Sequence, residues 1–156
     1  MNRKGRSGWL LNATGLELNE MTKKTHIAIG TLVSIPFLAS PIGLIGLFGS
    51  IAPDLDIKLG MRVHRTFTHS LIFLLFTTLI INIFSGQVAL IWFISYSSHL
   101  FLDSLTVSGI PLMWGINSKK YGLRFCGTGL LIDKLLCIIG TCILFVSIGD
   151  MIVKIF

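Results

Sequence analysis

The histidines of this chain, and three aspartates that could bind a metal ion with them, lie in three short polar segments of an otherwise apolar sequence. All four histidines and three of the seven acidic residues fall within residues 25–26, 53–70 and 99–103. Histidine and aspartate are ligands for zinc and for harder divalent ions, and ionisable side chains are costly near a bilayer. Their grouping predicts one metal site at a membrane surface.

Two pairs of residues have the spacing of ligands to a shared cation. His99 and Asp103 are four apart, so on a helix their side chains share one face, with Cβ atoms about 6 Å apart. Asp54 and Asp56 are two apart in a segment expected to be extended, where both side chains point the same way. Adjacent carboxylates repel unless a cation or proton lies between them. The alternative for His99 and Asp103 is an ordinary hydrogen-bonded pair. The alternative for Asp54 and Asp56 is a solvated loop in which one aspartate caps a helix.

The remaining histidines complete a donor set of nitrogen and oxygen atoms. Thr68 is expected to cap the helix that follows His69. A set of imidazole and carboxylate donors without a thiolate suits zinc first, as one ion or two, with manganese or iron as alternatives. The predicted metal ligands are His26, Asp54, Asp56, His64, His69, His99 and Asp103.

This donor set predicts hydrolytic chemistry. A metal-activated water, its pKa lowered to about 7, would attack an ester or phosphoester. Asp54 or Asp56 could instead act as the general base. Arg65 would stabilise developing negative charge, or else contact a lipid headgroup. The predicted catalytic residues are therefore Asp54, Asp56 and Arg65.

The composition is that of an integral membrane protein. The chain is 53% hydrophobic and only 13% charged, with a mean hydropathy of +0.82, whereas soluble domains are about 25% charged. The net charge is +6, but the basic residues flank apolar segments, which is typical of membrane helices rather than of nucleic-acid binding. Three cysteines without a CxxC motif argue against a disulfide framework or a thiolate zinc site.

The apolar segments predict an all-α, multi-pass fold that positions the polar ones. Residues 27–52 are interrupted by Pro36 and Pro41, and each half is shorter than the ~20 residues that cross a bilayer. We expect a helical hairpin there, followed by three membrane helices at about 70–85, 88–106 and 130–153. Residues 21–156 would form one membrane-embedded domain. Residues 1–20 are either a disordered tail or an overextended start that precedes the true initiator, Met21.

Charge distribution predicts the orientation of this domain. If residues 27–52 return to their starting side, one face carries most of the basic residues, and the positive-inside rule makes that face cytoplasmic. The N-terminus and the metal site would then share the cytoplasmic face of the cell membrane. The basic residues concerned are Lys23, Lys24, Lys58, Arg62, Arg65, Lys119, Lys120 and Arg124.

These motifs resemble the YdjM family of bacterial inner-membrane proteins over roughly residues 22–130. The resemblance is carried by Thr25-His26, the PDLD motif at 53–56, the HRTFTHS motif at 64–70 and the HLFLD motif at 99–103. The family often has glycine after the His-Arg pair, where this chain has Thr66. The resemblance implies a metal-dependent hydrolase. The family is also labelled LexA-binding, which we interpret as a reference to gene regulation, and nothing in the chain indicates binding to that repressor. It also implies a distant likeness to zinc phospholipase C and P1-type nucleases, onto which only His99 and Asp103 map.

The sequence thus predicts a membrane-bound, metal-dependent hydrolase. Its partners would be the lipid bilayer and a lipid or phosphoester substrate at the cytoplasmic face, with no nucleic acid; the sequence leaves the oligomeric state open. The alternatives are a non-enzymatic membrane protein with a structural metal site and a small transporter subunit. A transporter site is expected near the bilayer midplane, whereas these ligands gather at one interface.

Overall fold

The described part of the chain is a bundle of helices. The computed structural model describes residues 21–37, 43–59, 66–117, 119–123, 125 and 131–155. The α-helices are α1 (Lys23–Val33), α2 (Gly43–Ile51), α3 (Leu71–Phe84), α4 (Gly86–Ser104) and α5 (Leu131–Ile155). Three 3₁₀ helices accompany them: η1 (Ile35–Phe37), η2 (Ala52–Leu59) and η3 (Phe67–His69). Among these residues the all-α prediction is confirmed, with one isolated bridge between Ile110 and Tyr121.

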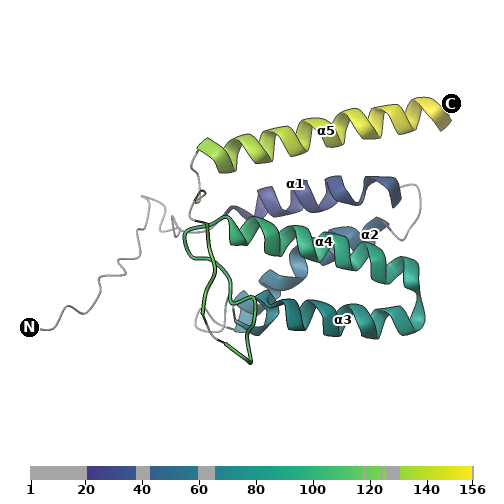
Figure 1. The fold of residues 1–156 in the computed structure, drawn as a ribbon. Coiled ribbons are helices and arrows are strands. Elements are labelled where there is room, and N and C mark those ends of the chain that lie inside the picture. Colours follow the sequence, from purple (N-terminus) through teal and green to yellow (C-terminus); the bar gives the residue numbers. More distant parts are fainter. Residues whose placement is uncertain are drawn as a thin grey trace, which may run out of the picture.

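Residues 27–52 form two short helices that run in opposite directions, as the prolines predicted. α1 has 11 residues and α2 has 9, about 16 Å and 14 Å at the usual rise per residue. η1, which contains Pro36, follows the end of α1. Figure 1 shows α1 beginning, and η2 ending, at the end of the bundle where α4 ends. The hairpin therefore brings its two outer ends to the same side.

Small residues allow the first two helices and α4 to pack closely. A Cβ added at Gly30 would overlap the side chain of Ser50, and one added at Gly46 would overlap that of Ser34. Ser34 Oγ lies 2.8 Å from Ser95 Oγ on α4. Close contacts between small residues, with hydroxyl groups hydrogen-bonded across helices, are typical of packing within membranes.

α3 and α4 form a tight antiparallel pair joined at Ser85. The Ser85 side chain caps α4 by accepting a hydrogen bond from the amide of Val88. Ser70, not Thr68, caps α3 by accepting from the amide of Phe73. The prediction of a Thr68 cap was therefore wrong, because that hydroxyl donates to Asp56 instead.

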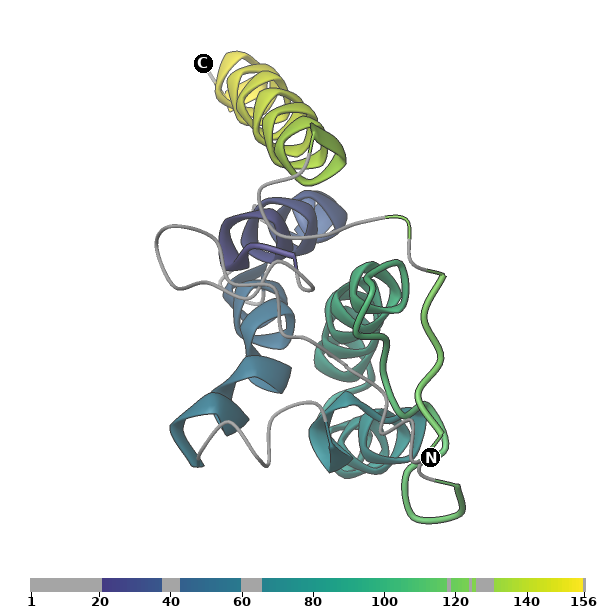
Figure 2. The ribbon, with the colours of Figure 1, turned by 90° about the vertical axis from the view of Figure 1, so that its left-hand side faces the viewer.

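The bundle has a polar interior and an apolar exterior. Buried apolar side chains form two small clusters, one of Leu74, Tyr96, Leu100 and Ile110 and one of Met21 and Leu102. Many large apolar side chains of α3 and α5 are exposed, such as Phe84 and Phe145. One described helix, α5, is long and apolar enough to cross a membrane by itself, over Leu131–Asp150. It lies along α1 at the edge of the bundle (Figure 2).

Candidate metal centre

Four elements converge at one end of the bundle and bring together five side chains that can bind metals. His26 comes from the first turns of α1, Asp54 from η2 and His69 from η3. His99 and Asp103 come from the last turns of α4. Four of the five side chains are at most 4% exposed, and Asp54 is 12% exposed.

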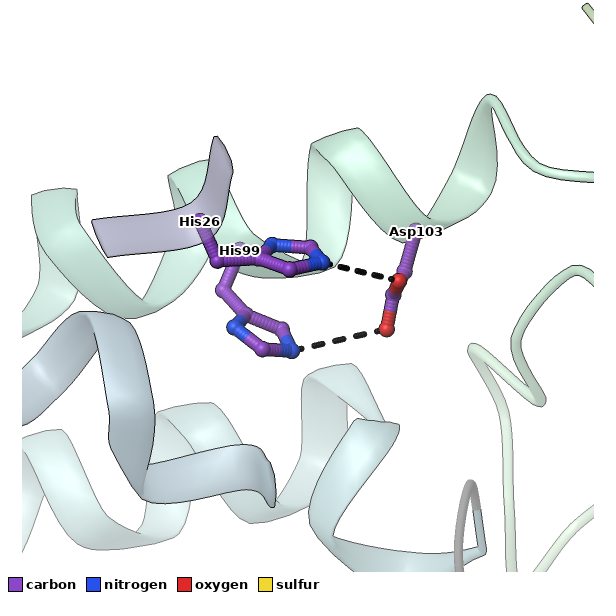
Figure 3. A group of neighbouring side chains, drawn as sticks. All are labelled: His26, His99 and Asp103. Carbon is purple, nitrogen blue, oxygen red and sulfur yellow. Dashed lines mark ion pairs between the residues drawn. The ribbon is translucent and has the colours of Figure 1, made fainter. Parts of the chain in front are cut away.

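Asp103 lies between the three imidazoles. Its Oδ1 atom is 3.4 Å from His26 Nε2, and its Oδ2 atom is 3.2 Å from His69 Nε2 and 3.4 Å from His99 Nε2. Figure 3 shows the rings of His26 and His99 on the same side of Asp103, each facing one oxygen of its carboxylate. The four-residue spacing of His99 and Asp103 thus places both side chains on one helix face, as expected.

The Oδ1 atom of Asp54 approaches two of these imidazoles, those of His69 and His99. This atom is 3.7 Å from His69 Nε2 and 3.5 Å from His99 Nε2. Ligand atoms about 2.0–2.1 Å from a tetrahedral ion lie about 3.3 Å from each other. The separations of 3.2–3.7 Å between these nitrogens and oxygens are therefore close to those of a metal's coordination shell.

The orientation of His99 suits a metal ligand. Its Nδ1 atom lies 2.7 Å from the carbonyl oxygen of Ser50, so Nδ1 carries the proton that is donated there. In the neutral ring, Nε2 then carries the lone pair that points toward Asp54 and Asp103. Nε2 is buried and has no hydrogen-bond partner among the described residues, which suits a site that receives an ion.

His69 is oriented from its other edge by Asp56 and Thr68. Its Nδ1 atom is 3.5 Å from Asp56 Oδ2 and 3.1 Å from Thr68 Oγ1, and Thr68 donates to the same carboxylate. Asp56 therefore lies on the Nδ1 side of the ring, while Asp54 and Asp103 lie on the Nε2 side. The expected extended conformation of this segment was wrong, because residues 52–59 form a 3₁₀ helix.

Burial and neighbouring charges shift the pKa values of His69 and Asp54, the two residues of the cluster that lie on 3₁₀ helices. Burial lowers the pKa of His69, but the carboxylates of Asp103, Asp54 and Asp56 outweigh it and raise that pKa from 6.5 to about 9. Burial acts to raise the pKa of Asp54, yet His69 and His99 hold it well below its usual range. Without a metal ion, Asp54 is therefore ionised and His69 is protonated near neutral pH.

Two predicted site residues, His64 and Arg65, lie outside the described residues. The sequence reasoning also missed two contributors, Tyr96 and Asp133. The buried Tyr96 hydroxyl donates to the carbonyl of Thr68 and so fixes the segment that carries His69. Asp133 accepts a hydrogen bond from Thr25, beside His26. The sequence did offer a signal for Asp133, because an aspartate near the start of a long apolar segment is costly in a membrane.

Comparisons with known proteins agree with the motifs. The model of the family described as YdjM inner membrane protein matches residues 21–154. Uncharacterized protein YvsG of Bacillus subtilis (strain 168) is 32% identical, over 60% of this chain and 73% of that protein. No solved structure matches the chain. Because the family model spans nearly the whole described bundle, the chain belongs to the YdjM family of inner membrane proteins.

Proposed function

We propose that this chain is a membrane-bound, metal-dependent hydrolase that acts on a phosphoester or lipid-linked ester at the cytoplasmic membrane face. The convergence of three imidazole Nε2 atoms with the carboxylates of Asp54 and Asp103 carries the proposal. Two groups within the cluster, His26-His99-Asp103 and Asp54-His69-His99, are each compact enough to hold a metal ion.

The donor atoms suit zinc best, with manganese or iron as alternatives. His69, His99, Asp54 and Asp103 would hold one ion, and His26 with the other Asp103 oxygen would extend that shell or hold a second ion. When bound, such an ion supplies Lewis acidity that polarises an ester and lowers the pKa of water toward neutrality.

The protein side chains would divide the remaining tasks. Asp54 is the most exposed of the five, so substrate would approach from its side. Its lowered pKa keeps it ionised but makes it a weak base, which favours a role as ligand over a role as proton acceptor. Asp56 would keep the His69 ring oriented through Nδ1, as carboxylates commonly do behind metal-bound histidines.

The surface near the centre supports its placement at the headgroup level. The segment after α4 exposes Trp114, Tyr121 and Phe125 together with Lys119 and Lys120. Aromatic residues gather at membrane interfaces, and lysines gather on the cytoplasmic side. In this orientation the three membrane helices would be α3, α4 and α5, of which α5 alone among the described helices has the length and apolar composition to cross a bilayer by itself. The two short helices α1 and α2 would enter the bilayer as a hairpin.

Metal analysis joined to a hydrolysis assay tests the proposal. Protein purified in lipid nanodiscs should contain stoichiometric transition metal and should cleave phosphoester or lipid-ester probes. His99→Ala and Asp103→Ala should remove both properties, whereas Asp150→Ala, an exposed carboxylate at the far end of α5, should keep them. Wild-type protein without stoichiometric metal would disprove the proposed function.

A structural metal site is the second candidate, and the burial of the cluster favours it. His69, His99 and Asp103 are at most 1% exposed, and structural sites are usually closed to solvent. In that case metal removal should lower thermal stability, and the metal-loaded protein should show no activity toward any ester probe.

A further inference from the structure

We propose that Asp133 is a positioning residue that holds the first turn of α1, and with it His26, from α5. The inference rests on the proposed metal site, because His26 is one of its ligands. Asp133 is 1% exposed and lies in the first turn of the helix best suited to cross a membrane. A carboxylate is expensive to bury there unless it has a specific task.

Asp133 accepts hydrogen bonds from three groups at the start of α1. Its Oδ1 atom lies 2.6 Å from Thr25 Oγ1 and 3.3 Å from both the amide nitrogen and the hydroxyl of Thr22. Thr22 is the N-cap residue of α1, yet its side chain makes no capping hydrogen bond within that helix. Asp133 thus supplies, from another helix, the negative acceptor that a helix N-terminus favours.

The same turn carries a proposed metal ligand. The amides of Thr25 and His26 both donate to the carbonyl of Thr22, at 3.0 Å and 3.3 Å. Loosening of this turn would therefore move His26 relative to Asp103, whose Oδ1 atom is 3.4 Å from His26 Nε2. Gly140, seven residues after Asp133 on α5, allows α5 to lie close to α1. A Cβ added at this position would press on the side chain of Ile29.

Cobalt binding tests the role of Asp133, because Co²⁺ reports both affinity and ligand geometry through its visible spectrum. Asp133→Ala and Thr25→Val should each weaken Co²⁺ binding roughly tenfold, as loss of a supporting contact commonly does. Both should also change the visible spectrum in the way His26→Ala does. Asp133→Asn and Thr25→Ser keep a hydrogen-bonding group and should restore binding. Asp150→Ala is the matched control on the same helix and should bind as wild type.

A double-mutant cycle separates positioning of His26 from a general effect on folding. In a His26→Ala background, Asp133→Ala should cause no further loss of Co²⁺ affinity. An equal loss with and without His26 would overturn the inference, as would wild-type binding by both Asp133→Ala and Thr25→Val. Either of these two outcomes would contradict the role of Asp133 without contradicting the proposed metal site. Wild-type protein that binds no metal would instead refute the proposed function and this inference together.

Discussion

Metal binding at the candidate centre should strengthen steeply between pH 7 and pH 9. The neighbouring carboxylates outweigh the effect of burial and raise the pKa of His69 to about 9 in the metal-free protein. At pH 7 only about one such ring in a hundred is neutral, and a metal binds only the neutral ring. The proton on His69 alone should therefore hold the apparent affinity at pH 7 at least about a hundredfold below its high-pH limit. The affinity should gain at least about tenfold from pH 7 to pH 8 and continue to rise to pH 9.

The direction of this effect follows from which state binds the proton. Protonated His69 stabilises the metal-free folded state fully below pH 6.5, and this contribution disappears as the pH rises through about 9. A bound ion must displace that proton, so binding at pH 7 should release at least one proton per ion. The release attributable to His69 should fall to about half a proton at pH 9 and vanish about two pH units above that.

Calorimetry and chelator competition can measure both quantities. Zinc affinity is obtained at pH 7, 8 and 9 against a chelator whose own pH dependence is known. The binding heat in two buffers of different ionisation enthalpy gives the number of protons released. Asp150→Asn serves as the control and should leave both results unchanged. A corrected affinity that stays constant from pH 7 to pH 9 would refute the reasoning about His69.

Three further predictions concern packing, ligand orientation and membrane contact. Gly46→Ala should destabilise the bundle by about 1–3 kcal/mol, because the new methyl group meets Ser34. Thermal unfolding measures this loss. Gly149→Ala is the control, because that position has open space on α5, and it should be neutral or slightly stabilising in the same assay. Thr68→Val removes a donor to the carboxylate behind His69 and should weaken zinc binding about tenfold, with Thr68→Ser close to wild type. Trp114, as the sole tryptophan of a variant in nanodiscs, should be quenched more by lipids brominated near the headgroup than by lipids brominated near the chain end; the reverse order would contradict an interfacial location.

Local spacing predicted the parts of the centre that depend on a single element. His99 and Asp103 share a face because helix geometry is regular, and the prolines of residues 27–52 interrupt a helix whatever surrounds them. The roles of Asp54 and Asp56 were harder to separate. Both were expected to point the same way, yet they lie on opposite edges of the His69 ring, because the segment is a 3₁₀ helix.

The sequence by itself determined the membrane class, the all-α fold and the kinds of donor atom, since composition and periodicity carry that information locally. Only the tertiary structure decided how those donors meet. The carbonyl of Ser50 selects the ring nitrogen of His99 that faces the centre, and Asp133 reaches α1 across more than a hundred residues of sequence. Such contacts depend on how separate helices pack. The periodicity of one segment contains no information about its distance from another segment.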